Sequence, residues 1–356
     1  MLINETPIRT SKSFNINNIE INDFNINKKD IKPFQNYKIE NNFEEALEVN
    51  NIKSDIDFKY GLGQEIEKYI KESNLNLEIN LNDYKNKENI LKIDINLDDQ
   101  NMNLISNIVF NLNEGSKNTI TFILKTNNKA KVYNAINKIK VNAMENSNTN
   151  FIFINNTNTK TYNFLELESE HRENSKLNFM VIDFGGKYSV TNLYSNVKEY
   201  NAEEKINGIY LGKDDQVLDL NYIAHLYGKN TKSFINIQGA LLDKSIKHFK
   251  GTIDFKNGCK KAEGDVNEEC MLLSDKAKST SFPALLATED DVNGSHSNAI
   301  SKVDNKSKFY VMSRGFSKKE TEILMIKAKF NKILENIEDI DLRNNILEEI
   351  ENRLIK

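Results

Sequence analysis

The sequence is poor in residues that cross-link, kink or anchor a chain. Its 356 residues include two cysteines, three prolines and no tryptophan. Two cysteines are too few for a disulfide framework or a closed zinc site, so we expect Cys259 and Cys270 to be free thiols. The N-terminus lacks the apolar stretch of a secretory signal, and no apolar run approaches the roughly 18 residues of a membrane span. These absences favour a cytoplasmic protein that does not enter a membrane.

An excess of charge of one sign is also absent. The chain has 48 Lys and Arg residues against 52 Asp and Glu residues, which gives a formal net charge of -4. This balance provides no general attraction to nucleic acid or to an anionic membrane. The length allows one large core or two to three smaller ones. We therefore expect a globular protein with no nucleic-acid partner.

The usual catalytic motifs are missing as well. The sequence has no Gly-rich loop ending in Lys-Ser or Lys-Thr, no His-Glu-x-x-His, no Cys-x-x-Cys pair and no nucleophile elbow. The chain therefore lacks the parts needed to hydrolyse a nucleotide by itself, and we expect no catalytic residue.

The first 74 residues contain little that predicts a core. Short apolar pieces alternate with Asn and charged residues up to about residue 60, and Pro7 and Pro33 lie among them. We expect an extended arm with little core of its own. Residues 61–73 carry Leu62, Ile66 and Ile70 at helical spacing, which predicts a short amphipathic helix at the end of this region.

From residue 75 the apolar period changes to two, which is typical of β-strands. Short strand-like segments follow one another for about 200 residues, separated by Asn, Gly, Ser and Asp. Their pattern favours an all-β sandwich, barrel or solenoid, and because no exact repeat is visible, periodicity does not choose among these. Residues 131–143 fit a helix or a strand, and we favour a strand. The segments are 75–81, 93–97, 120–124, 151–154, 164–167, 177–182, 206–211, 234–237 and 253–255.

The last 52 residues return to a helical period. Ser317 and Glu320 have the spacing of a capping box, and an apolar stripe follows them. Asp341 can cap a second helix, so the tail predicts a helical hairpin. Such a stripe more often packs on the protein's own core than on a partner.

One histidine stands out among the four, which are His171, His225, His248 and His296 and lie far apart in the sequence. Small residues flank His296, including Ser295, and leave its imidazole accessible. An acidic run at residues 289–291 precedes it, so a solvated acidic turn is the plain alternative. From the residues alone, His296 is the histidine most worth weighing as a ligand.

The two cysteines have different surroundings. Cys270 lies beside an apolar strand, where packing explains it, and the neighbouring Glu268 and Glu269 disfavour a thiolate. Cys259 lies in a basic turn that is more favourable to a thiolate, although a turn cysteine is commonly incidental. Neither thiol is a strong candidate site.

Three stretches of the second half resemble the SufB/SufD family of iron-sulfur cluster assembly proteins in order and spacing. They are GALLDKSIKHFKGTIDFKNGCKKAEGD (239–265), LLSDKAKSTSFPALLATEDDVNGSHS (272–297) and KFYVMSRGFSKKET (308–321). The N-terminal stretch NETPIRTSKSF (4–14) also looks like the arm of that family. The resemblance is strong from about residue 200 onward and fainter before it.

The resemblance implies a right-handed parallel β-helix flanked by helical regions at both ends. The expected division is an N-terminal arm and short helical region at 1–74, the β-helix at 75–304 and a C-terminal helical region at 305–356. Members of the family form a SufB–SufD pair that carries the ATPase SufC on the C-terminal helical regions. In this chain the docking segment would be Ser313, Arg314, Gly315 and Phe316.

Two positions favour the SufD type. Where SufB-type members carry a cysteine, seven residues before the Asp of the LLxxD motif, this chain has Glu268. Where SufD-type members carry Ser-His after Asp-Asp-Val, it has Ser295 and His296. The resemblance thus implies a non-catalytic scaffold subunit, with a transient iron-sulfur cluster formed at the interface with a SufB-type partner and His296 as an interface ligand.

Other possibilities remain at this point. A homodimer is possible when the chain is alone. A β-solenoid carbohydrate-active enzyme is the alternative function, which the missing tryptophan and paired-acid motif disfavour. A self-assembling structural β-helix is a third, although it leaves the helical tail without a purpose.

Overall fold

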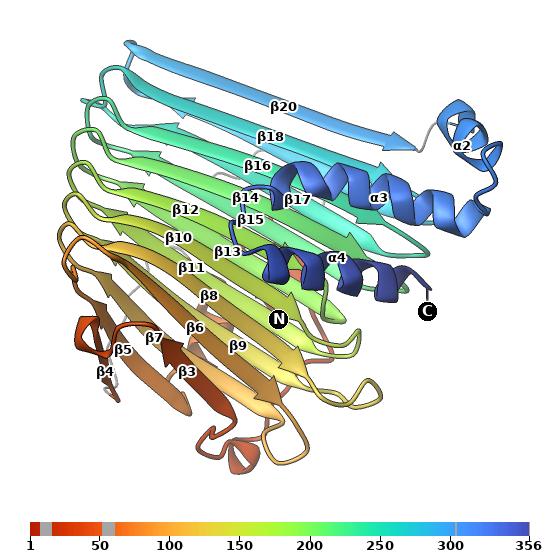
Figure 1. Cartoon of the computed structure of the whole chain (residues 1–356), viewed down its shortest axis with the longest axis horizontal. Helices are drawn as coiled ribbons and strands as arrows, with labels where there is room; N and C mark the ends of the chain where they lie inside the picture. Colours follow the sequence, from red (N-terminus) through yellow and green to blue (C-terminus); the bar gives the residue numbers. More distant parts are fainter. Residues whose placement is uncertain (8–15, 52–60, 303–304, 356) are drawn as a thin grey trace.

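The computed structural model describes residues 1–7, 16–51, 61–302 and 305–355. The chain forms a parallel β-solenoid whose two walls are nine-stranded sheets, here called sheet I and sheet II (Figure 1). Each turn of the solenoid adds one strand to each sheet. Sheet I consists of β3 (Tyr37–Asn41), β6 (Glu88–Leu97), β8 (Lys117–Thr126), β10 (Asn148–Asn156), β12 (Lys176–Asp183), β14 (Glu203–Gly212), β16 (Lys232–Leu241), β18 (Ala262–Leu272) and β20 (Val292–Lys302). Sheet II consists of β4 (Leu47–Asn50), β5 (Leu75–Leu81), β7 (Asn103–Leu112), β9 (Asn134–Ala143), β11 (Tyr162–His171), β13 (Tyr188–Val197), β15 (Val217–Leu226), β17 (Ile246–Phe255) and β19 (Lys278–Ala287).

The strand pairing is that of a solenoid and excludes a sandwich or a barrel. From β5 onward each strand pairs in parallel with the second strand after it, so the chain alternates between the sheets. Within the two sheets, the described antiparallel pairs are β3 with β6 and β4 with β5. One turn takes from 26 residues, between paired Tyr162 and Tyr188, to 32 residues, between Ile246 and Lys278. This variation explains why no fixed repeat is visible in the sequence.

The interior of the solenoid is apolar over most of its length. Side chains alternate between the two faces of each strand, and the inward set includes phenylalanines that stack from turn to turn. The rings of Phe122 and Phe153, for example, are parallel with centroids 5.3 Å apart. Every segment predicted as a strand lies in a strand, including residues 131–143, most of which form β9.

The outer face of sheet II is covered by the N-terminal region. There α1 (Gln64–Ile70), β1 (Leu2–Ile3) and β2 (Ile19–Glu20) pack on apolar side chains of β7, β9, β11 and β13. The predicted helix is confirmed, and the apolar residues of the arm share a core with sheet II. Ile3, Ile19 and Ile21 are buried, because the outward Phe164 and its neighbours on sheet II need an apolar cover. Residues 8–14 of the arm motif lie outside the described residues.

The outer face of sheet I is covered by two helices from the C-terminal region. Figure 1 shows α3 (Lys318–Leu334) and α4 (Ile340–Ile355) lying across this sheet, after the shorter α2 (Asn305–Met312). Phe330 and Ile350 pack there against Ile152, Ile182 and other apolar residues of β10 to β16. The expected boundary between residues 304 and 305 falls beside the undescribed residues 303–304. No helix in the described part of the chain is both long and apolar enough to cross a membrane.

Of the two caps predicted for α3 and α4, the first is confirmed and the second is wrong. Ser317 caps α3 and forms the complete capping box with Glu320, as predicted. In α4 the amide of Leu342 donates to the carboxylate of Asp339, at 2.9 Å. The predicted cap Asp341 is wrong, because α4 begins at Ile340 and Asp341 already lies within its first turn. Within the described residues, the N-terminal region also contains two short 3-10 helices, η1 (Lys28–Asp30) and η2 (Glu44–Ala46).

Candidate functional site at the open end of the solenoid

The last strand of each sheet leaves the solenoid open at one end. Among the described strands, β20 pairs only with β18, and β19 pairs only with β17. One edge of each strand therefore keeps its backbone donors and acceptors free of any other strand described here. β20 is exposed along nearly its whole length. This end of the molecule is the natural place for a further strand to add.

His296 lies on the side of β20 that continues the interior of the solenoid. It is paired with Val266 of β18, which is fully buried in the interior. Paired residues of neighbouring parallel strands point to the same face of a sheet. The imidazole nevertheless remains exposed, since none of the described strands forms a further turn over it. His296 thus lies on the interior-facing side of the last strand of sheet I, where it is exposed. It does not lie in the acidic turn that was the alternative from the sequence.

Ser295 points to the opposite face of β20. It is paired with Asp265, and its hydroxyl donates a hydrogen bond to the carboxylate of that residue. The structure therefore places the two predicted residues next to each other without bringing their side chains to one site. The acidic run forms the turn before β20, where Glu289 accepts a bond from the amide of Gly258, at 3.1 Å.

A buried ion pair lies one turn below His296, and the sequence analysis did not find it. The ammonium of Lys247 is 2.8 Å from the carboxylate of Glu268, with side chains 0% and 1% exposed. Tyr210 donates a hydrogen bond to one carboxylate oxygen, at 2.7 Å. Ser281 donates to the other oxygen, at 2.8 Å, and accepts a bond from Lys247, at 2.7 Å. All of these groups face the interior near the open end.

A signal for this pair exists in the sequence. Lys247 precedes Phe249 and Ile253 at the inward positions of β17, and Glu268 follows Val266 at an inward position of β18. A charged residue at a position that alternation assigns to the interior requires a partner of opposite charge. The two residues are 21 apart in sequence, so only the register of the solenoid shows that they meet.

The two cysteines are buried and poorly suited to nucleophilic chemistry. Burial raises the pKa of Cys270, which lies two positions beyond Glu268 on β18. Burial, together with the negative charge of Glu289, raises the pKa of Cys259 to about 11. The thiolate-friendly surroundings expected for Cys259 are therefore wrong, because the thiol turns into the core while the lysines of the turn remain outside.

The other three histidines do not join His296. The His171 ring is buried beside Ser169, at 3.0 Å, the His225 ring lies 3.6 Å from Asp254, and the His248 ring lies 3.4 Å from Asp219. Over the ranges that the structure describes, no group of three or more His, Cys, Asp and Glu side chains is arranged as metal ligands would be.

A second exposed surface lies on α2 and the turn after it. Phe309 and Tyr310 are 74% and 60% exposed, and Phe316 is 46% exposed. Arg314 donates to the hydroxyl of Tyr310, at 2.9 Å, and lies over its ring. The predicted docking residues Ser313, Arg314, Gly315 and Phe316 are all exposed. Aromatic side chains gathered at an exposed surface are typical of a protein-binding site.

Comparison with known proteins gives the family. Residues 95–329 match the model for the SufBD core domain of the SUF system of iron-sulfur cluster assembly. The chain belongs to the SufBD family. The match covers most of the solenoid and extends into α3, so the family is shown by far more than the three stretches quoted from the sequence.

Two of the similar proteins carry the name SufD, in agreement with a SufD-like chain. The chain is 32% identical over 152 residues to an iron-sulfur cluster assembly SufBD family protein of Pyrococcus horikoshii. It is 30% identical over 118 residues to the iron-sulfur cluster assembly protein SufD of Bacillus subtilis, and 24% identical over 174 residues to that of Escherichia coli. These matches cover 43%, 33% and 48% of this chain, and 33%, 27% and 40% of the relatives. The chain therefore matches less than half the length of each of these relatives.

Proposed function

We propose that the protein is a SufD-type scaffold subunit of a SUF complex, which pairs with a SufB-type paralogue and binds a SufC-type ATPase. The observation that carries the proposal is the exposed His296 on the terminal strand of a SufBD-family solenoid. The iron-sulfur cluster is the cargo of the complex, and this chain supplies a surface for its formation and no catalytic residue. ATP hydrolysis belongs to the SufC-type partner.

The free edges of β19 and β20 support pairing at this end. An exposed edge strand can add a strand from another chain through backbone hydrogen bonds. A SufB-type partner that extends sheets I and II would cover the open end and enclose His296. One imidazole supplies one ligand, so the partner must provide the others, and a thiolate would be the softer ligand that iron clusters prefer. Without that partner, a second copy of this chain would use the same edges.

The ATPase would dock on α2 and the turn formed by Ser313, Arg314, Gly315 and Phe316. The exposed aromatic side chains there provide an apolar anchor, and the Arg314 guanidinium stacks on Tyr310. This surface lies beyond the end of β20 (Figure 1). One chain could therefore bind both partners at once.

Co-expression tests the assembly directly. The chain is produced with its cognate SufB-type and SufC-type proteins and analysed by gel filtration with light scattering. We expect one species with the mass of a complex that contains all three chains. Elution of this chain alone, while the two partners are present and folded, would contradict the proposal.

A further inference from the structure

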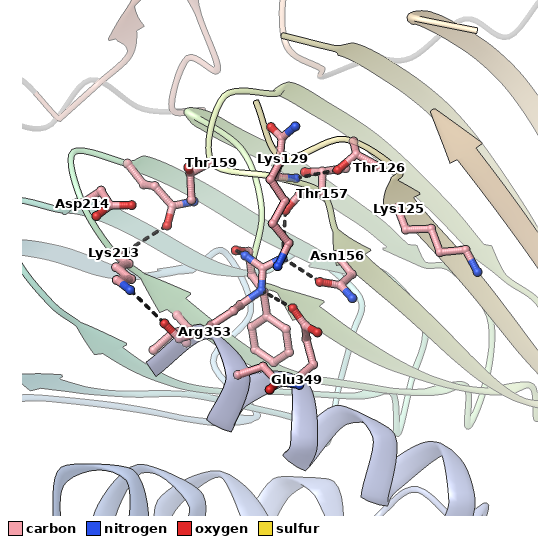
Figure 2. Close-up of a pocket in the computed structure, with 15 residues that line it drawn as sticks. Lys125, Thr126, Lys129, Asn156, Thr157, Thr159, Lys213, Asp214, Glu349 and Arg353 are labelled. Atoms are coloured by element: carbon pink, nitrogen blue, oxygen red, sulfur yellow. Dashed lines mark hydrogen bonds and ion pairs between the residues drawn. The ribbon is translucent and has the colours of Figure 1, made fainter. Parts of the chain in front are cut away.

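A cavity of about 430 Å³ lies far from the open end, where the last turn of α4 meets sheet I (Figure 2). In a parallel solenoid the carboxyl ends of alternate strands meet at one edge, and here β8, β10 and β14 contribute, together with Phe184 just after β12. α4 closes one wall with Glu349, Asn352 and Arg353. The volume is within the range of roughly 300–1,000 Å³ that is usual for small-molecule sites.

Arg353 makes this wall rigid. Its guanidinium donates to the side chain of Asn156, at 2.6 Å, and to the carbonyl of Thr157, at 2.8 Å. It also donates to the carbonyl of Phe184 and to Glu349. Since most of its donors are already used, Arg353 holds α4 on the solenoid and leaves the recognition of a ligand to other residues. The cavity is therefore preformed.

The lining carries an excess of positive charge. Lys125, Lys129, Lys213 and Arg353 are its cationic residues, and Asp214 and Glu349 are its anionic ones. The chain as a whole has a net charge of -4, so this concave site differs in sign from the rest of the molecule. A cleft lined by charges of one sign concentrates ions of the opposite sign.

The lysines approach the cavity from different turns. Figure 2 shows Lys213 and Lys125 on opposite sides, with Lys129 between them. The ammonium of Lys213 donates to the carbonyl of Arg353, at 3.0 Å, which keeps this charge beside the end of α4. Lys125 is 42% exposed and lies 3.7 Å from Asp94. An anion between these side chains would meet positive charge from two sides.

The remaining lining suits a phosphate ester with a polar body. Thr126, Thr157 and Thr159 add polar residues to the lining, and Phe184 and Leu211 add apolar ones. We propose that this cavity binds a small phosphate monoester, with the phosphate between the lysines and the organic portion toward α4. Because α4 and the solenoid share the site, the bound molecule would also stabilise their contact.

Calorimetric titration of the full chain tests the proposal. The probes are AMP, ribose 5-phosphate and glycerol 3-phosphate, and each is matched by its uncharged counterpart, adenosine, ribose or glycerol. We expect at least one monoester to bind with saturation at one site per chain, at least tenfold more tightly than its uncharged counterpart. Higher ionic strength should weaken the binding.

Paired variants locate the site. Lys125→Gln with Lys129→Gln should weaken the binding at least tenfold. The matched control is Lys117→Gln with Lys176→Gln, which removes two exposed lysines from the opposite ends of β8 and β12 and should leave the affinity unchanged. Failure of all three monoesters to bind, equal binding of the uncharged compounds, or equal losses in the two double variants would overturn the proposal. The titration uses the chain alone, so its result is independent of whether the SUF complex forms.

Discussion

The imidazole of His296 combines two properties that are rarely found together in one side chain. By register it belongs to the interior of the solenoid, because it shares a face with Val266. By position it is exposed, because no strand in the described part of the chain lies beyond β20. A partner that adds strands at this edge would therefore enclose the imidazole in a shielded space, where a bound iron would be protected from water.

A substitution series separates a ligand role from a structural one. His296→Ala should leave the complex intact and lower the activity of a cluster-dependent enzyme in cells at least tenfold, whereas His296→Cys should restore part of it because a thiolate also binds iron. The control is Asn298→Ala, at a residue that lies on the same face of the same strand and is also exposed. Unchanged enzyme activity in His296→Ala would show that this residue is no ligand.

Individual residues differ in how far the sequence can locate them. His296 was found because its small neighbours and its Ser-His step resemble a family motif, which needs no coordinates. The partnership of Lys247 and Glu268 was not found, although Glu268 was noted for the cysteine that it replaces. A buried charge is tolerated only beside its partner, and the register that sets these two 2.8 Å apart is a property of the whole fold.

At the scale of elements, α2 differs from the other helices of the C-terminal region. α3 and α4 bury Phe330 and Ile350 against sheet I, whereas α2 leaves Phe309 and Tyr310 in solvent. An exposed aromatic pair adds little to the stability of the isolated chain. Such residues commonly anchor a protein interface.

Substitutions on α2 and in the turn after it should separate ATPase binding from folding. Phe309→Glu and Phe316→Glu should each weaken binding of the SufC-type ATPase by about tenfold to a hundredfold, because a charge replaces an anchor of the interface. The thermal midpoint of the isolated chain should hardly change. Ile340→Glu is the control, since this residue is 61% exposed at the start of α4. Binding of the Phe309→Glu and Phe316→Glu variants with the affinity of the unaltered chain would exclude this surface as the docking site.

The sequence specifies the two long C-terminal helices well and their ends less well. The capping box of Ser317 needs only local contacts, so its prediction was correct. For α4 two acidic residues compete within three positions, and the choice of Asp339 over Asp341 depends on where packing against sheet I starts the helix. Both aspartates are good capping residues by local chemistry, and the packing of α4 determines which of them is the cap.

At the scale of the molecule, one repeating feature could have revealed the solenoid. Asn146, Asn174, Asn201 and Asn230 each adopt a positive φ at equivalent corners, and the side chain of Asn201 donates to that of Asn174, at 2.9 Å. Asparagine tolerates this conformation better than most residues. In a sequence so rich in Asn, however, four corner residues at slightly unequal spacing do not stand out. The family resemblance therefore identified the β-helix where the periodicity did not.

Three carboxyl groups of neighbouring turns give the whole molecule a distinctive pH dependence. Burial raises the pKa of Asp183 to about 6, of Glu168 to about 7 and of Glu166 to about 8. Each of these groups binds its proton more tightly in the folded chain than in the unfolded one. Their contribution to stability is therefore complete below the unfolded pKa values, near 4, and is lost as the pH rises through 6 to 8.

The free energy of unfolding should therefore fall between pH 5 and pH 8, by on the order of 1.5 kcal/mol for Asp183 alone, whose pKa rises to about 6 on folding. Urea unfolding followed by circular dichroism measures this, since the chain has no tryptophan. Asp183→Asn should make this decrease in the free energy of unfolding smaller by about that amount, because an amide does not ionise. The amide has the same shape as the carboxyl group and can keep the contacts to Ser189 and Asn155. Asp275→Asn, at an exposed carboxylate whose pKa is lowered by Lys302, should leave the fall unchanged. An unfolding free energy that is constant or rises from pH 5 to pH 8 would mean that these carboxyls are not held protonated in the fold.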